Sequence, residues 1–136
     1  MNSDIIDFQK GLILCGDPCT GKSLIVNFFG AVMPGQIFNL GGRNKKLFKD
    51  PFVFSTLTED HKLILVDDVK CISTIEATYP LIQTGQVIVR RQMREDIERK
   101  CPPIIITTTV NYSELLQVPG LFRRFHIVEI SICSYT

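Results

Sequence analysis

Short runs of apolar residues predict buried β-strands at three places in the chain. They cover residues 12–15, 63–66 and 104–106, and within each run no polar residue alternates with an apolar one. Strands of this kind are buried on both faces, which is typical of a parallel sheet with helices on each side. Two weaker strands are predicted over residues 36–39 and 126–132, the second at an edge of the sheet.

The stretches between these strands are long enough for crossover helices. We expect helices over residues 22–29, 47–54 and 72–82, with Pro80 distorting the last turn of the third. The alternation of strand and helix predicts an α/β fold with a mainly parallel five-stranded sheet flanked by helices. With 136 residues the chain has the length of a single domain, which we expect to span residues 1–136.

One segment breaks the alternation of strand and helix. Residues 87–89 are β-like, residues 94–100 are charged, and Met93 lies between them. This pattern predicts a β-hairpin that projects from the sheet. An exposed amphipathic helix over residues 92–100 fits the same pattern equally well.

Composition narrows the class of protein. Hydrophobic residues make up 45% of the chain, and no apolar run approaches the roughly 18 residues that a membrane-spanning helix needs. The first ten residues contain no signal-peptide core, so we expect a soluble protein that is not secreted and has no membrane partner. With a net charge of +1, the surface as a whole is not basic, so any nucleic-acid binding must involve a local group of basic residues. The five cysteines show no metal-ligand spacing and are expected to be reduced thiols.

A complete phosphate-loop motif, GxxxxGK followed by Ser, stands directly after the first predicted strand and opens the first predicted helix. Its residues are Gly16, Asp17, Pro18, Cys19, Thr20, Gly21, Lys22 and Ser23. Gly16 and Gly21 allow the backbone N–H groups to turn inward, and the helix N-terminus adds partial positive charge. Lys22 is then placed to reach the β- and γ-phosphates, and the Ser23 hydroxyl to bind Mg²⁺. We therefore predict ATP and Mg²⁺ as cofactors.

Two adjacent carboxylates end the second predicted strand. Asp67 and Asp68 follow residues 63–66 directly, in the form of a Walker B motif. Like charges so close raise each other's pKa, and a divalent cation relieves that cost. We expect Asp67 to act on the metal side and Asp68 to orient or polarise the attacking water. A solvated strand end with two polar caps is the alternative.

Polar residues also follow the third predicted strand and precede the last one. Thr109 and Asn111 are candidates for contact with the γ-phosphate or the attacking water, although Asn111 would also suit the N-cap of a following helix turn. Arg124, beside Arg123, is a candidate arginine finger for the nucleotide of a neighbouring subunit. Paired arginines at a strand start are otherwise simply solvated.

In this order the motifs resemble the superfamily 3 helicases of small DNA viruses. GLILCG with TGKS, and KCPP before the third strand, resemble papillomavirus replication initiators. DDVK and LFRRF are similar to polyomavirus members, and GQ before the hairpin segment resembles parvovirus members. The resemblance covers residues 10–130 and does not choose among the three virus families.

The resemblance implies the motor core of an ATP-dependent DNA helicase with an AAA+-like P-loop NTPase fold. It implies a hexamer that hydrolyses ATP between subunits and a hairpin that binds single-stranded DNA in the channel of the ring. It also implies a viral protein of the host nucleus or cytoplasm. Arg124 takes the finger position. The family's sensor asparagine falls on Thr109, and Asn111 comes two residues later.

The family's basic hairpin tip falls near residues 92–94, so Arg90, Arg91 and Arg94 are the DNA-binding candidates. Neighbouring acidic residues leave a net charge of only +2 over residues 90–100. This also fits a hairpin whose charged residues pair with one another in salt bridges. The family carries an origin-binding domain and a helical collar ahead of the motor, so we expect an excised core or a reduced relative. An ATP-binding assembly or remodelling module with little or no helicase activity is the alternative function.

Overall fold

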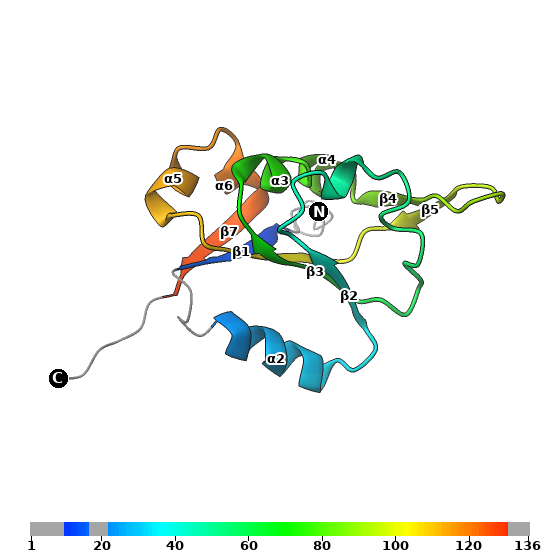
Figure 1. Cartoon of the computed structure of the whole chain (residues 1–136), viewed down its shortest axis with the longest axis horizontal. Helices are drawn as coiled ribbons and strands as arrows, with labels where there is room; N and C mark the ends of the chain where they lie inside the picture. The colour runs from blue at the N-terminus through cyan, green and yellow to red at the C-terminus, as the bar shows by residue number, and fades with distance from the viewer. Residues whose placement is uncertain (1–9, 17–21, 131–136) are drawn as a thin grey trace, which may run out of the picture.

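A sheet of five parallel strands forms the centre of the molecule (Figure 1). The computed structural model describes residues 10–16 and 22–130. The strand order is β2-β3-β6-β1-β7. The strands are β1 (Gly11–Cys15), β2 (Ile37–Gly41), β3 (Leu63–Val69), β6 (Ile104–Thr108) and β7 (Phe125–Glu129). Every pairing between neighbours is parallel, and β7 lies at an edge, so the predicted sheet and its edge strand are confirmed.

Helices cover both faces of this sheet. Figure 1 shows α2 (Lys22–Val32) alone below the sheet, and the shorter helices above it. The shorter helices are α3 (Ile72–Glu76), α4 (Tyr79–Thr84), α5 (Tyr112–Leu116) and α6 (Leu121–Arg124). The outer side of α2 exposes Leu24, Phe28 and Val32, which are four residues apart. None of the helices in the described ranges is long and apolar enough to cross a membrane.

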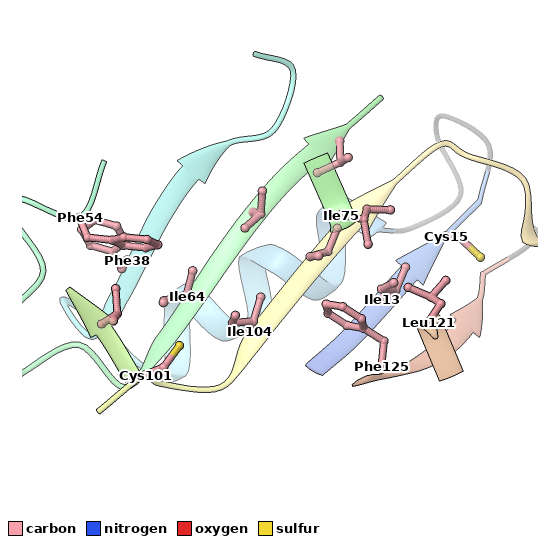
Figure 2. Close-up of a cluster of buried hydrophobic side chains, with 14 of the residues drawn as sticks. Ile13, Cys15, Phe38, Phe54, Ile64, Ile75, Cys101, Ile104, Leu121 and Phe125 are labelled. Carbon is pink, nitrogen blue, oxygen red and sulfur yellow. The ribbon is translucent and has the colours of Figure 1, made fainter. Parts of the chain in front are cut away.

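Successive residues of the central strands pack into two separate cores. Ile13, Ile64 and Ile106 belong to the larger core under α3 and α6, part of which is drawn in Figure 2. Leu14 and Ile105 belong to the smaller core, which packs against α2. Each such side chain, when fully buried, contributes about 1.5–3 kcal/mol. Burial on both faces explains why these strands read as unbroken apolar runs.

The segment that interrupts the strand–helix alternation forms a β-hairpin. Strands β4 (Gln86–Val89) and β5 (Ile97–Lys100) pair antiparallel, and the hairpin projects from the sheet (Figure 1). Val87 and Val89 are buried in the larger core, while Ile88 between them is exposed. The predicted hairpin is therefore confirmed, and the alternative of an amphipathic helix over residues 92–100 is wrong.

Two predicted helices are wrong in extent. Residues 47–54 contain only the 3₁₀ helix η1 (Leu47–Lys49), followed by turns. Asp50 is extended because it precedes Pro51, which disfavours the α conformation. Residues 72–82 form two helices, α3 and α4, rather than one. Pro80 lies in the first turn of α4, where its missing N–H costs nothing, instead of distorting a last turn.

Candidate nucleotide-binding site

The carboxyl ends of β1 and β6 meet at Lys22, the first residue of α2. The Lys22 Nζ donates to the carbonyl oxygens of Gly16 at 2.5 Å and Thr108 at 3.2 Å. The Gly16 N–H also donates to the Thr108 oxygen, at 3.2 Å. Lys22 is partly buried, and both of its acceptors among the described residues are uncharged. This leaves a positive charge at the helix N-terminus, which is where an anion binds favourably.

Only some of the other residues of the predicted phosphate loop are among those that the structure describes. Ser23 is exposed in the first turn of α2. The predicted binding residues Asp17, Pro18, Cys19, Thr20 and Gly21 lie outside the described residues.

Asp67 and Asp68 lie within β3, at a shift of its register against β6. The shift falls between Val66 and Val69, and Asp68 has φ of 64°, in the left-handed region that few residues other than glycine adopt. Its N–H donates to the Thr107 Oγ1 at 2.8 Å, and that hydroxyl donates to the Asp67 Oδ1 at 2.5 Å. A threonine of β6 thus joins the Asp68 backbone to the Asp67 carboxylate.

The Asp68 carboxylate has cationic partners of its own. Arg43 Nε pairs with its Oδ2, and Lys70 Nζ lies 3.0 Å from its Oδ1. Arg43, with Lys70 adding to its effect, holds the pKa of Asp68 below its usual value, although partial burial acts in the opposite direction. The expected rise in the pKa of Asp68 is therefore wrong, because Arg43 and Lys70 stabilise its charged form.

The two sensor candidates occupy different positions after β6. Thr109 follows the strand directly and is half-buried. Asn111 is exposed at the N-cap position of α5, where its side chain makes no capping bond to the backbone. The Asn111 amide instead donates to the Glu114 Oε1 at 3.4 Å. Thr109 directly follows Thr108, whose carbonyl accepts from the Lys22 Nζ, whereas Asn111 lies two residues further along the chain.

Arg124, at the end of α6, contacts its own chain. Its Nη1 donates to the Gly120 carbonyl at 2.9 Å, and its Cζ lies 4.4 Å from the centroid of the Tyr79 ring. Gly120 leaves room for this contact, since a Cβ there would lie 2.5 Å from the Arg124 Nη1. The neighbouring Arg123 is exposed.

The hairpin arginines differ in their partners. Arg90 Nε lies 3.8 Å from the Asp96 Oδ2, and Arg91 Nη2 donates to the Glu95 carbonyl at 3.2 Å. Arg94 is exposed, and no ion pair involves it within the described part of the chain. Met93 beside it is fully exposed, with φ of 57°. Within the described residues, Arg91 and Arg94 thus both lack an acidic partner, and Arg94 is the more exposed of the two.

A hollow of about 380 Å³ separates the hairpin tip from the turns that follow η1. Its lining residues are Phe52, Ser55, Arg91, Gln92 and Arg94. It therefore combines a partly exposed aromatic ring with two guanidinium groups.

Sequence reasoning missed four residues of this region: Arg43, Lys70, Thr107 and Thr108. The run of three threonines at the end of the 104–109 segment was a signal for Thr107 and Thr108. Arg43 carried no signal, because it reaches Asp68 across 25 residues of chain.

Two side chains of the candidate site carry oxygen atoms of the kind that binds Mg²⁺ together with a nucleotide. The Ser23 hydroxyl and the Asp67 carboxylate are oxygen ligands of the kind that Mg²⁺ prefers. Over residues 10–16 and 22–130, no group of three or more His, Cys, Asp or Glu side chains is placed to hold a metal ion.

A family model described as papillomavirus helicase matches residues 6–132. The chain belongs to this family. Of the three resemblances in the motifs, the match supports the papillomavirus one. Replication protein E1 of human papillomavirus 66 is 32% identical over 123 residues, and the match covers 85% of this chain and 18% of that protein. Replication protein E1 of human papillomavirus 30 is 28% identical over 120 residues, and the match covers 86% of this chain and 18% of that protein. The chain thus spans about a fifth of these relatives.

Solved structures share the fold of this family member. The apo C-terminal region of NrS-1 has a TM-score of 0.64 at 14% identity, over 92% of this chain and 30% of that one. A JCV helicase with a bound small molecule has a TM-score of 0.58 at 17% identity, over 95% of this chain and 40% of that one. These likenesses confirm the predicted P-loop α/β fold.

Proposed function

We propose that this chain is a single-domain motor core, residues 1–136, of a viral replication-initiator helicase that unwinds DNA with ATP in the host nucleus or cytoplasm. The observation that carries the proposal is Lys22, whose ammonium group joins the ends of β1 and β6 by donating to the Gly16 and Thr108 carbonyls. Membership of the papillomavirus helicase family supports the same function.

ATP and Mg²⁺ are held by the phosphate loop in this proposal. The residues are Gly16, Asp17, Pro18, Cys19, Thr20, Gly21, Lys22 and Ser23. Lys22 exchanges the Gly16 and Thr108 carbonyls for phosphate oxygens, a stronger partner because both groups are then charged. Ser23 and Asp67 hold the Mg²⁺, which neutralises charge on the phosphates when bound.

Hydrolysis depends on groups around the phosphate loop. Asp68 orients and polarises the attacking water, with Thr109 or Asn111 as the polar contact at the end of β6. Arg124 reaches the nucleotide of a neighbouring subunit and stabilises the charge that develops there. Because that contact comes from a second copy, the active site is complete only in a ring, which we propose is a hexamer.

DNA is bound by the hairpin. Arg90, Arg91 and Arg94 bind phosphates of a single strand in the ring channel. Arg94 contributes most because it is exposed, whereas Arg90 lies near Asp96 and the partly buried Arg91 donates to the Glu95 carbonyl. The hollow beside Phe52 supports this proposal, since an aromatic ring next to arginines is a surface on which unpaired bases stack.

Lys22→Ala tests the nucleotide site. Loss of a charge-assisted contact worth about 1.5–3 kcal/mol should lower the affinity for ATP·Mg²⁺ by about tenfold or more. Titration calorimetry measures this, with Lys62→Ala as the control because Lys62 is exposed and its Nζ donates to the Glu59 carbonyl. Unchanged affinity in Lys22→Ala contradicts the assignment.

The rate of ATP hydrolysis tests the motor. Single-stranded DNA should stimulate hydrolysis at protein concentrations that allow assembly. A protein that binds ATP but hydrolyses none under those conditions is an assembly module, and the helicase proposal is then wrong.

A further inference from the structure

The strand that carries both carboxylates bulges against β6. The register of the two strands shifts between Val66 and Val69 of β3. Across this shift β3 has two residues, Asp67 and Asp68, where β6 has only Thr107. A bulge interrupts the ladder of backbone hydrogen bonds and changes the direction of nearby side chains, and bulges are common beside active sites. Thr107 is therefore the residue of β6 that lies opposite both carboxylates.

The Thr107 hydroxyl forms two hydrogen bonds with the bulge. It accepts the Asp68 N–H at 2.8 Å and donates to the Asp67 Oδ1 at 2.5 Å. One hydroxyl can make both bonds because its oxygen accepts while its hydrogen is donated. Only 2% of Thr107 is exposed, so a variant without the hydroxyl leaves the Asp68 N–H without its buried partner.

These contacts lie on the face of the sheet that α2 covers. Leu65 of β3 and Ile105 of β6 pack in the smaller core against α2, and residues two apart along a strand share a face. Asp67 and Thr107 follow them by two residues each. Helix α2 begins at the end of the phosphate loop and carries Ser23 in its first turn (Figure 1). The bonded carboxylate is thus on the face that carries the other proposed Mg²⁺ ligand.

The next threonine fixes the far end of the bulge. The Thr108 Oγ1 donates to the Val69 carbonyl at 2.7 Å. The Thr108 carbonyl accepts from the Lys22 Nζ at 3.2 Å. Adjacent residues of β6 therefore contact the bulge of β3 and the lysine of the phosphate loop.

We propose that Thr107 is a positioning residue for the metal, which fixes the Asp67 carboxylate through Oδ1 and leaves Oδ2 for Mg²⁺ or a water bound to it. Asp67 is exposed, and within residues 10–16 and 22–130 its Oδ2 accepts no hydrogen bond. Removing a group that orients a metal-binding side chain typically changes metal affinity or activity by about 10–100-fold. The inference rests on the proposed binding of ATP with Mg²⁺ and adds a residue outside the phosphate-loop motif.

Titration calorimetry with and without Mg²⁺ is the first test. Thr107→Val removes the hydroxyl at nearly constant size, so the affinity for ATP·Mg²⁺ should fall about tenfold or more, whereas the affinity for ATP without Mg²⁺ should not change. Thr107→Ala should behave in the same way, and Thr107→Ser should keep the wild-type affinity. In an Asp67→Asn background, Thr107→Val should add little further loss, because the two changes remove the same interaction.

Thr78→Val is the matched control. Thr78 is as buried as Thr107, and its hydroxyl donates to the Ile75 carbonyl at 2.6 Å. It precedes α4, which lies on the other face of the sheet (Figure 1). This variant should leave both affinities unchanged.

Hydrogen exchange of the Asp68 amide provides a readout without nucleotide or metal. Its N–H should exchange about tenfold faster in Thr107→Val and Thr107→Ala, because its acceptor is gone, and at the wild-type rate in Thr107→Ser. An unchanged exchange rate in both hydroxyl-free variants would overturn the proposal, since the hydroxyl would not hold the bulge.

Two calorimetric outcomes would also overturn it. One is an unchanged affinity for ATP·Mg²⁺ in the hydroxyl-free variants. The other is an equal loss of affinity with and without Mg²⁺, which would mean that Thr107 acts on the fold of the site and not on the metal. A wild-type chain that binds no ATP would instead refute the proposed function.

Discussion

At the scale of single residues, adjacent carboxylates in β3 have different neighbours. The Asp67 carboxylate accepts from Thr107 of β6, and the Asp68 carboxylate pairs with Arg43 and Lys70. The register shift between Val66 and Val69 separates them. This difference in neighbours is consistent with the proposed roles, in which Asp67 acts on the metal and Asp68 on water.

Exchange of each carboxylate for an amide should separate these roles. Asp68→Asn should leave ATP affinity largely intact and reduce hydrolysis strongly, because the lost group acts on water. Asp67→Asn should weaken the part of ATP binding that depends on Mg²⁺. Calorimetry with and without Mg²⁺ and a phosphate-release assay measure the effects. Wild-type hydrolysis in both variants would mean that the pair is only structural.

Cys71 has an acidic thiol. Its Sγ lies 3.2 Å from the Ser73 Oγ and 3.3 Å from the Thr74 Oγ1, and these hydroxyls lower its pKa from 9.0 to about 7. Burial instead raises the pKa of Cys101 to about 11. Since the thiolate is the reactive form, reactivity at Cys71 should increase as pH rises through about 7.

Iodoacetamide labelling read by peptide mass spectrometry tests this. Cys71 should be modified much faster than Cys101 at pH 7.5, and its rate should be about half-maximal near pH 7. Ser73→Ala removes one hydroxyl and should move that midpoint to higher pH. Equal rates at Cys71 and Cys101 would contradict the assignment.

At the scale of secondary-structure elements, what the sequence could predict depends on whether the signal is local. Residues 63–66 and 104–106 lie in strands because burial on both faces demands apolar side chains, so their pattern was sufficient. The helix predicted over residues 47–54 does not form because Pro51 keeps Asp50 in an extended conformation. The spacing of apolar residues gives no sign of this short-range effect. The pairing of Arg43 with Asp68 could not be predicted, since it depends on β2 lying beside β3.

The end of β2 gives a prediction at this scale. Gly42→Ala should destabilise the protein by about 1–3 kcal/mol, because its Cβ would overlap the Asp67 carbonyl and Val69. Gly41→Ala is a matched control, since a Cβ there meets nothing within 4 Å, and its effect should stay within about 0.5 kcal/mol. Urea unfolding of the two variants measures the difference. Equal stability would show that the loop does not approach β3 so closely in solution.

At the scale of the whole molecule, a monomer presents one hairpin, whereas a ring presents several to one strand of DNA. Each phosphate contact on a single strand adds about −0.7 to the slope of log affinity against log salt. The slope should therefore be shallow for the monomer and steeper than −1 for the protein assembled with ATP and Mg²⁺. Sedimentation and fluorescence anisotropy at several salt concentrations measure assembly and slope.

Arg94→Ala should flatten that slope in the assembled state without changing ATP affinity, and Lys62→Ala serves as the control. A slope that is unaffected when Arg90, Arg91 and Arg94 are all replaced would remove the hairpin from the DNA site.

In the proposed ring, the contacts that Arg124 makes within its own chain make assembly depend on nucleotide. An arginine that stacks on Tyr79 and donates to Gly120 must give up both before it can act in a neighbouring subunit. The ring contact contributes about 0.5–1 kcal/mol and the hydrogen bond about 1 kcal/mol, so each subunit enters a ring against a small opposing free energy. A nucleotide phosphate bound in the neighbouring subunit gives Arg124 a charged partner in place of these contacts. A neighbouring subunit without nucleotide gives it no such partner. Rings built this way would persist while nucleotide is bound and loosen after it leaves.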